Sequence, residues 1–480
     1  MAEEKGITPQ AEDFSRWYID TISRAELMDY SPVRGCIVFK PDGYELWERV
    51  QQGLDRRFKA TGHRNAYFPM LIPESFFEKE KEHVEGFSPE LPWLTEAGGE
   101  KLEERLALRP TSETIIGHMY SQWIQSYRDL PVLLNQWANV FRWEKRTMPF
   151  LRTSEFLWQE GHTAHATEEE ARQETLTILE IYRDFVESEM AIPLQVGQKT
   201  PSERFAGAVD TYSIEAMMKD GKALQAGTSH YLGQNFAKGF EIKFLDRDNQ
   251  QKYVYTTSWG ASTRLIGALV MVHGDDRGLA LPPRMATVQV VMIPVGPPKL
   301  REKVMEKFTP VFEALKDAGV RVHADFRDET PGWKFNEWEM RGVPLRLELG
   351  PRDVDSNQCV LARRDTGEKV TAGLDGIVDT IKNLLDAIQA NMYEKAKAFR
   401  DEHSHYDVDT IEALKAHMDE RETYGWILAG WCGSNECEAK VKEETKFTAR
   451  NIPFNPPATK HKCLYCGGEA KHTVWYAKAY

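Results

Sequence analysis

The sequence contains no apolar run long enough to cross a lipid bilayer, no internal repeat and no low-complexity tract. A membrane-spanning helix needs about 20 consecutive apolar residues, so we expect no membrane contact. The first five residues are polar and acidic rather than signal-like. We therefore expect a soluble, cytoplasmic protein.

An excess of positive charge is also lacking. The formal net charge is −13 at pH 7, which argues against a generally basic surface that binds nucleic acid. Any RNA contact must come from a local basic area on an acidic molecule. The Gly-x-x-x-x-Gly-Lys-Ser/Thr loop and the Gly-x-Gly-x-x-Gly fingerprint are missing as well. A nucleotide would therefore not be held in a P-loop or in a dinucleotide-binding fold.

Cysteine is absent between residues 37 and 358, and four of the six cysteines fall near the end of the chain. These four form two close pairs, Cys432-x4-Cys437 and Cys463-x2-Cys466. In a cytosolic chain such pairs are more typical of a metal site than of disulfides. Four thiolates can close a tetrahedral structural zinc site, whereas buried free cysteines would not explain the pairing. We predict Zn²⁺ at this position.

The length of 480 residues and a hydrophobic fraction of 41% allow several domains with separate cores. A proline pair at 282–283, followed by a change of pattern, predicts a boundary. We predict three units: residues 1–284, 285–405 and 406–480. In the second unit, strands predicted at 287–295, 320–325, 343–349 and 358–363 alternate with helices predicted at 299–318, 332–341 and 374–400. This alternation indicates a mixed α/β unit.

Two apolar runs, 137–143 and 150–160, are joined by a short basic loop and predict an antiparallel hairpin. Arg142 and Glu144 are two residues apart, so we expect both on one face, with Arg152 opposite on the returning strand. An arginine fork suits a phosphate or a carboxylate. For an isolated Arg-x-Glu, an ion-pair ladder on a solvated sheet is the more ordinary explanation.

The segment 108–114, Leu-Arg-Pro-Thr-Ser-Glu-Thr, precedes an apolar helix. Thr111 and Glu113 can cap that helix, because a carboxylate is favoured at a helix N-terminus. A carboxylate beside a hydroxyl is also what an ammonium group needs. The sequence leaves both explanations open.

Two further segments suit close approach to a ligand. Residues 221–234 are rich in Gly, Gln and small hydroxyl residues, as fits a strand beneath a ligand or a plain turn. Residues 257–268 predict a strand that turns into a helix, with small residues that let the backbone approach a nucleotide. Arg264 would then reach a phosphate from the side opposite Arg142.

These segments, in this order, resemble the motifs of class II aminoacyl-tRNA synthetases. Phe141-Arg142-x-Glu144, the basic loop and Arg152-x-x-x-Phe156 resemble the second motif, and the strand and helix around Arg264 resemble the third. A helix leading into the proline-containing run 65–73, which should lie at an edge or interface, resembles the first motif, the dimer contact of that family. Residues 225–233, Gln-Ala-Gly-Thr-Ser-His-Tyr-Leu-Gly, match a segment of prolyl- and related synthetases. The whole set is similar to prolyl-tRNA synthetases of the archaeal/eukaryotic type.

The resemblance implies an α+β and α/β multidomain fold. It comprises a class II catalytic domain built on an antiparallel sheet, a mixed α/β anticodon-binding domain and a small zinc-containing C-terminal domain. The implied activity is activation of L-proline with ATP and Mg²⁺ to prolyl-adenylate, followed by transfer to the 3′ end of tRNA(Pro), by a homodimer. No side-chain nucleophile is required, since the protein orients the reactants and neutralises developing charge.

The resemblance also assigns residues. The implied catalytic residues are Arg142 and Arg264. The implied proline-binding residues are Thr111, Glu113, Arg142, Trp158, Glu160, His162, His230 and Ser258. The implied ATP-binding residues are Arg142, Glu144, Arg152, Thr153, Gln225, Thr228, Ser262 and Arg264. The implied anticodon readers are Phe335, Glu339, Arg346, Arg352 and Lys369, in a segment whose aromatic and charged residues suit splayed bases, although an aromatic helix face is more often core.

Two alternatives stand at this point. One is a class II synthetase for threonine, serine or glycine; a threonine enzyme would need zinc in its catalytic pocket, and the chain has no cysteine between residues 37 and 358. The other is a non-catalytic, synthetase-like RNA-binding or regulatory protein. Such proteins have usually lost the motif arginines, whereas Arg142 and Arg264 are both present.

Overall fold

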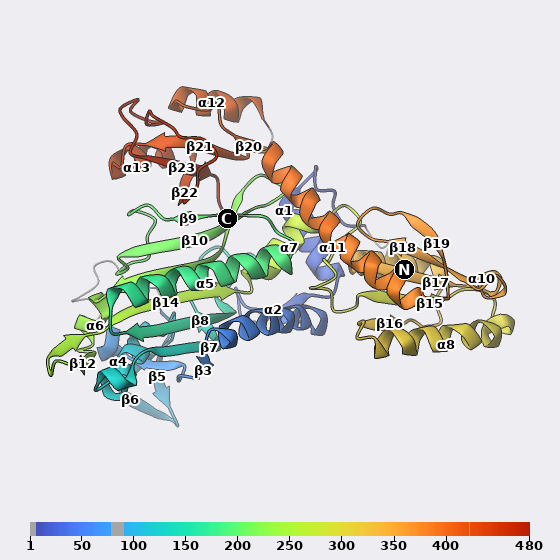
Figure 1. The fold of residues 1–480 in the computed structure, drawn as a ribbon, viewed down its shortest axis with the longest axis horizontal. Helices are drawn as coiled ribbons and strands as arrows, with labels where there is room; N and C mark the ends of the chain where they lie inside the picture. Colours follow the sequence, from blue (N-terminus) through green and yellow to red (C-terminus); the bar gives the residue numbers. More distant parts are fainter. Residues whose placement is uncertain (1–5, 78–90, 422) are drawn as a thin grey trace.

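The computed structural model describes residues 6–77, 91–421 and 423–480, and it shows a large sheet with a smaller sheet at one end (Figure 1). The five N-terminal residues, which the sequence predicted not to be a signal, lie outside the described residues. In the described ranges, no helix combines the length and the apolar character needed to cross a membrane.

The large sheet has eleven strands in the order β20-β21-β23-β22-β9-β10-β11-β14-β8-β7-β3. Their bounds in chain order are β3 (Arg64–Asn65), β7 (Val132–Phe141), β8 (Glu155–His165), β9 (Leu194–Gln198), β10 (Asp210–Met217), β11 (Ala223–Gly233), β14 (Tyr255–Ser262), β20 (Ser404–His405), β21 (Trp426–Trp431), β22 (Thr448–Pro453) and β23 (His472–Ala477). The strands from β9 to β7 pair antiparallel throughout. The prediction of an antiparallel catalytic sheet is confirmed.

One face of this sheet is covered by helix α5 (Glu168–Ser188), which runs along the strands in Figure 1. A capping box between Thr167 and Glu170 starts this helix, and its apolar side is buried. Helices α1 (Phe14–Arg24), α2 (Pro41–Ala60) and α7 (Arg264–His273) complete the main core. Helix α2 begins at a proline, whose missing N–H costs nothing in a first turn.

Close packing on this face depends on Gly161 of β8. Its partner in register is Trp259 of β14, whose ring packs against Phe58, His63 and Tyr182. A Cβ atom at Gly161 would lie 2.0 Å from the ring of Trp259. Only glycine therefore lets the indole lie flat across β8.

A three-stranded sheet lies beside the large one, with the order β4-β6-β5. Its strands are β4 (Leu71–Pro73), β5 (Trp93–Ala97) and β6 (Glu100–Leu108), and helix α4 (Glu113–Trp123) follows. The run 65–73, predicted as one strand, forms the end of β3 and all of β4. Both strands lie at sheet edges, so the edge position that proline predicted is confirmed, while the single continuous strand was wrong. Pro69 lies in the break between them.

The predicted hairpin also differs from the observed one. Strands β7 and β8 pair from Val132↔Ala164 to Phe141↔Glu155, so the ladder ends before Arg142. Residues 142–154 form a connection outside both strands, and the placement of Arg142, Glu144 and Arg152 on strands was wrong. A tight turn at 148–152, closed by a 2.7 Å bond from the Met148 N–H to the Arg152 carbonyl, replaces the ladder.

The sheet at the other end has five strands in the order β16-β15-β17-β18-β19. Its elements are β15 (Val290–Pro294), α8 (Arg301–Asp317), β16 (Val322–Ala324), α9 (Pro331–Met340), β17 (Leu345–Leu349), α10 (Pro351–Asp355), β18 (Gln358–Arg363), β19 (Lys369–Gly373) and α11 (Ile377–Glu402). Every strand and helix predicted here is present. The short helix α10 and the edge strand β19 were missed. Each has only five residues, and β19 is largely exposed at the sheet edge.

Helix α11 runs from the five-stranded sheet toward the C-terminal segment (Figure 1). That segment contains α12 (Ile411–Glu420), α13 (Asn435–Thr445) and strands β21 to β23. Its sheet continues into the large sheet, because Ile452 and Pro453 of β22 pair with Gln198 and Gly197 of β9. The chain end is docked as well: the Tyr480 N–H donates to the carbonyl of Ala223 at 3.1 Å.

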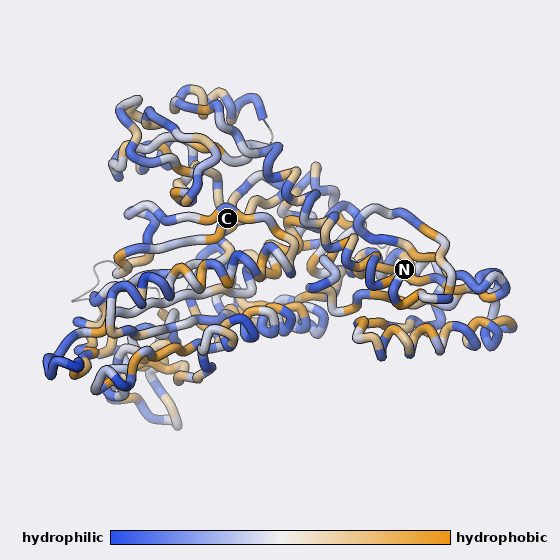
Figure 2. Tube along the Cα trace, viewed as in Figure 1, coloured by the Kyte–Doolittle hydropathy of each residue, from blue (hydrophilic) through white to orange (hydrophobic). Residues whose placement is uncertain are grey.

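The remaining elements are short. They are β1 (Met28–Tyr30), β2 (Ile37–Phe39), η1 (Tyr127–Asp129), α6 (Asn235–Gly239), β12 (Lys243–Leu245), β13 (Gln251–Tyr253) and η2 (Pro298–Leu300). Figure 2 shows hydrophobic stretches along the strands and hydrophilic stretches at the loops and outer helix turns. Separate apolar cores lie under the large sheet, the five-stranded sheet and the C-terminal strands.

We predict that Gly161→Ala lowers the free energy of unfolding by about 1–3 kcal/mol, because the new methyl group must displace the Trp259 ring. Denaturant titration followed by tryptophan fluorescence measures this change. Gly373→Ala is the matched control, since a Cβ atom there has no neighbour within 4 Å. Equal stability of the two variants would contradict the packing argument.

Candidate active site

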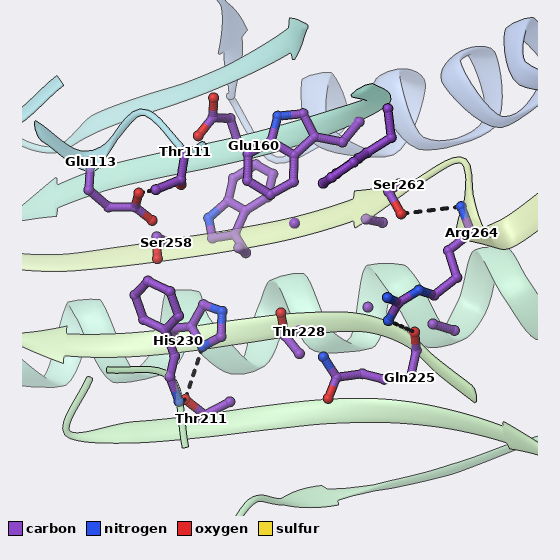
Figure 3. A pocket seen from close by; sticks show the side chains of 18 of the residues that line it. Thr111, Glu113, Glu160, Thr211, Gln225, Thr228, His230, Ser258, Ser262 and Arg264 are labelled. Carbon is purple, nitrogen blue, oxygen red and sulfur yellow. Dashed lines mark hydrogen bonds between the residues drawn. The ribbon is translucent and has the colours of Figure 1, made fainter. Parts of the chain in front are cut away.

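The strands β8, β14, β11 and β10 line a pocket of about 250 Å³ on the sheet face opposite α5. Their registers place side chains in cross-strand rows. One row is Thr211–His230–Ser258–His162, from four neighbouring strands. The next row contains Thr228, Gly260 and Glu160, and Gly260 leaves the floor open at its centre. Figure 3 shows five members of these rows around one cavity: Thr211, His230, Ser258, Thr228 and Glu160.

The pocket has chemically different ends. Figure 3 shows Thr111 and Glu113 at one end and Arg264 at the other, with Gln225 and Thr228 near the arginine. A carboxylate with a hydroxyl therefore lies at one end of the cavity, and the guanidinium of Arg264 lies at the other. Such a cavity can orient a ligand with a cation at one end and anions at the other.

Glu160 is a buried carboxylate that holds the acidic end together. It accepts hydrogen bonds from the Ser112 N–H (3.1 Å), from Gln136 Nε2 (2.9 Å) and from the Ser112 hydroxyl, and His162 Nε2 lies 2.9 Å away. Burial alone would raise the pKa of Glu160. The hydrogen bond and charge of His162, together with the bonds from Ser112 and Gln136, outweigh burial and lower this pKa below the ordinary value. Burial also disfavours charged His162, yet Glu160 raises the pKa of this imidazole. The two form a buried ion pair.

The loop that carries Thr111 and Glu113 is fixed by Arg109, whose side chain is completely buried. Its guanidinium donates to the carbonyls of Asn139 (2.8 Å) and Phe68 (2.7 Å). Thr111 donates to Glu113, and the residue at the N-cap of α4 is Ser112, whose side chain makes no capping bond. Thr111 is therefore not the cap of α4, whereas Glu113 lies in the first turn of that helix, where a carboxylate is favoured. Both side chains also line the pocket.

His230 and Ser258 lie next to the acidic end. Burial, followed by the charge of His162, lowers the pKa of His230 to about 3, so this imidazole is neutral. Its Nδ1 lies 2.9 Å from the hydroxyl of Thr211. The Ser258 hydroxyl is buried without a hydrogen-bond partner in the part of the chain that the structure describes, which leaves it available to a ligand.

Arg264 lies at the opposite end of the pocket (Figure 3). Arg142 lies nearer the acidic end: burial lowers its pKa, and the charges of Glu113 and Glu160 partly offset this. Arg142 donates through Nε to the Pro110 carbonyl at 3.0 Å, and its guanidinium lies 5.4 Å from the ring centre of Trp158. Arg264 donates through Nε to the Leu151 carbonyl at 3.1 Å. Burial, then the charges of Arg152 and Arg142, lower the pKa of Arg264 to about 10. Mutual repulsion among these cations would be relieved by an anion between them.

Most of the residues predicted for this site line the same pocket. They are Thr111, Glu113, Arg142, Trp158, Glu160, His162, Gln225, Thr228, His230, Ser258, Ser262 and Arg264. Glu144, Arg152 and Thr153 do not line it: Arg152 Nη1 lies 3.4 Å from Glu144 Oε2 in the 142–154 connection, and Thr153 faces a separate hollow beside β2.

Several pocket residues were not predicted as site residues. Phe156, Glu203 and Thr211 line the cavity. The two-residue period of a strand could have found Phe156, since it is two residues before Trp158. Glu203 and Thr211 belong to a loop and a strand brought in by tertiary pairing, and no local pattern marks them.

Four of the five predicted anticodon readers lie together. Phe335, Glu339, Arg346 and Lys369 line a pocket of about 210 Å³ on the five-stranded sheet. The guanidinium of Arg346 lies 4.1 Å from the Phe335 ring centre, and Lys369 Nζ lies 5.3 Å from it. Arg352, on α10, does not line this pocket. Glu339 accepts a 2.7 Å bond from Arg277, so the pocket contacts the segment that follows α7.

The four C-terminal cysteines form one cluster. The sulfur atoms of Cys432, Cys437, Cys463 and Cys466 all lie within 4.8 Å of one another. The wider spacing of the first pair is explained by α13, because Cys437 lies in its first turn while Cys432 follows β21. Burial raises the pKa of Cys463, but backbone N–H groups outweigh it and lower that pKa to about 7. A tetrahedron of Zn–S bonds of about 2.3 Å needs sulfur atoms about 3.8 Å apart, and this cluster fits it.

Comparison with known proteins agrees with this arrangement. A family model described as "tRNA synthetase class II core domain (G, H, P, S and T)" matches residues 93–273, an "Anticodon binding domain" matches 289–384, and "Prolyl-tRNA synthetase, C-terminal" matches 411–480.

Whole-chain relatives agree as well. A proline–tRNA ligase of Symbiobacterium thermophilum is 78% identical over 100% of both chains. A proline–tRNA ligase of Natranaerobius thermophilus is 56% identical, and proline–tRNA ligase 2 of Clostridioides difficile is 54% identical, each over 99% of this chain and 98% of the relative. The chain therefore belongs to the prolyl-tRNA synthetase family of class II aminoacyl-tRNA synthetases.

Proposed function

We propose that the protein activates L-proline with ATP to prolyl-adenylate and transfers the prolyl group to the 3′ end of tRNA(Pro). The observation that supports this most directly is one pocket with a carboxylate at one end, Arg264 at the other and Arg142 between them. Relatives up to 78% identical over the whole chain are named proline–tRNA ligases. They give no support to a threonine, serine or glycine enzyme, or to a non-catalytic relative.

At the acidic end, Glu113 and Thr111 would receive the secondary ammonium of proline. The buried Glu160–His162 pair holds this loop in place, and the neutral His230, the free Ser258 hydroxyl and Trp158 would surround the ring and carboxylate. The pocket needs no nucleophile. It needs to hold the carboxylate in line with the α-phosphorus of ATP.

Arg142, beside the acidic end, would contact the α-phosphate and the proline carboxylate, and Arg264, at the opposite end, would contact the terminal phosphate. Both are the catalytic residues of this proposal, because they neutralise charge that develops as the anhydride forms. Mg²⁺ that arrives with ATP would supply further neutralisation. Gln225, Thr228 and Ser262 line the intervening wall. Glu144, Arg152 and Thr153 do not line the pocket, and we assign them to the ATP site only from the resemblance to the family motif.

We assign the remaining functions to the other parts of the chain. Residues 1–284 form the catalytic domain, 285–405 the anticodon-binding domain and 406–480 the zinc-binding domain of this proposal. Phe335, Glu339, Arg346 and Lys369 would contact anticodon bases, with Arg352 on the adjoining surface. The four-cysteine cluster would hold one structural Zn²⁺. The protein would act in the cytoplasm as a homodimer, as the first motif implies.

Arg142→Ala is expected to reduce proline-dependent exchange of pyrophosphate into ATP by at least about 100-fold, or ~2.7 kcal/mol, because a charge on the developing anhydride loses its partner. Arg146→Ala, an exposed arginine of the same connection that does not line the pocket, is the control and should stay within about twofold. If Arg142→Ala retains activity within about tenfold, Arg142 is not the α-phosphate contact.

Arg346→Ala should raise the KM for tRNA about tenfold, or ~1.4 kcal/mol, while leaving proline activation within about twofold. The reason is that a stacked, cationic base contact lies far from the reacting atoms. Aminoacylation and pyrophosphate exchange are measured side by side, with Lys316→Ala on the exposed side of α8 as the control. Equal losses in both reactions would mean that Arg346 supports the fold instead.

Cys432→Ser should remove most of the bound zinc and lower the melting temperature, because a structural metal contributes its binding energy to folding. Elemental analysis of the purified protein and thermal unfolding measure the two effects. Cys36→Ser, a cysteine outside the cluster, should change neither. If the purified wild-type protein contains no zinc, the metal assignment is refuted.

A further inference from the structure

The wall loop, residues 199–209, closes one side of the active-site pocket. It brings Phe205 and Glu203 into the pocket lining. On its inner side, the Phe205 N–H donates to the Thr211 hydroxyl at 3.1 Å, and the Phe205 ring lies 4.6 Å from that of His230. The loop therefore fixes both Phe205 and the neutral imidazole.

The same loop is held from outside by helix α13 of the C-terminal segment. The Thr200 hydroxyl donates to Glu438 Oε1 at 2.7 Å, and these residues are 1% and 6% exposed. Farther along α13, Lys442 Nζ lies 3.6 Å from Glu203 Oε1. The Lys442 side chain is largely exposed, so this second contact is weak. The buried bond to a carboxylate is the strong one.

A second buried contact from the C-terminal segment reaches Glu215, the residue that binds the first residue of the wall loop. Glu215 of β10 accepts from Lys199 Nζ at 2.8 Å and from Arg450 Nη2 at 2.9 Å, and all three side chains are buried. Arg450 lies on β22, the strand that joins the C-terminal strands to β9. The first residue of the wall loop is thus held by Glu215, which Arg450 pairs from the C-terminal side.

We propose that Glu438 is a positioning residue for the amino-acid pocket. It does not touch the substrate. By holding Thr200 it keeps the wall loop closed, so that Phe205 packs on the proline ring and on His230. This inference rests on the proposed function, and it assigns the C-terminal segment a direct effect on amino-acid affinity.

The position of Glu438 in the chain strengthens this assignment. It follows Cys437 in the first turn of α13, and successive residues of a helix point in directions about 100° apart. One side of this turn therefore faces the thiol cluster, and the other faces the wall loop. A rigid thiol cluster would hold this turn of α13, and with it the Glu438 side chain, in a fixed position.

Glu438→Ala is expected to raise the KM for proline about tenfold in pyrophosphate exchange, with kcat and the KM for ATP changed less than twofold. The wall loop contacts the proline ring equally in the ground state and in the transition state. Loss of this contact therefore weakens binding of both states to the same extent. Glu438→Gln keeps an oxygen that can accept from Thr200 and should remain within about threefold of wild type. Glu436→Ala, an exposed glutamate of the same helix turn, is the matched control and should match wild type.

Hydrogen exchange gives a readout that does not depend on activity. Amides of residues 199–209 should exchange faster in Glu438→Ala than in Glu438→Gln, while those of β14 stay protected. Thr200→Val should reproduce the rise in KM, and the double variant should add no further loss, because both changes remove one bond.

An unchanged KM for proline in Glu438→Ala, or an equal rise for proline and ATP, would overturn the inference. So would additive effects in the double variant. Failure of the proposed function is a different result: wild-type protein would then show no proline-dependent exchange at all. If Glu438→Ala does not fold, the test rests on Thr200→Val, through its KM for proline and the hydrogen exchange of its residues 199–209.

Discussion

The pocket depends on the hydrogen bonds and the ion pair made by the buried carboxylate of Glu160. An ionised group inside a protein is costly unless it is paired and hydrogen-bonded. Glu160 meets that requirement with partners from three elements: Ser112 at the start of α4, Gln136 on β7 and His162 on its own strand. The loop that carries Thr111 and Glu113 is thereby tied to the sheet before any ligand arrives.

The arginines of the pocket have the opposite character. Arg142 and Arg152 lie near enough to Arg264 for their charges to add to burial in lowering its pKa, and Arg142 and Arg264 donate to backbone carbonyls rather than to carboxylates. The pocket thus pairs Glu160 within the protein and leaves the arginine charges to be neutralised by a ligand. This asymmetry suits a substrate whose phosphates complete the site.

The large sheet connects parts of the chain that are distant in sequence. Pairing of β22 with β9 places Arg450 beside Glu215, and the same junction brings α13 to the wall loop. A family model for the C-terminal segment matches residues 411–480 separately from the core. In the fold, however, this segment contributes buried contacts to a loop of the active site.

The sequence by itself determined the family, most elements of residues 290–402 and most of the pocket residues, because ordered motifs and hydrophobic periodicity are local signals. The four paired cysteines likewise predicted a cluster. The tertiary structure decided that residues 142–154 leave the sheet, and that Thr211 lies in one row with His230, Ser258 and His162. It also decided that Glu438 reaches Thr200. Strand register and helix docking depend on pairing between distant segments, and no spacing within one segment encodes them.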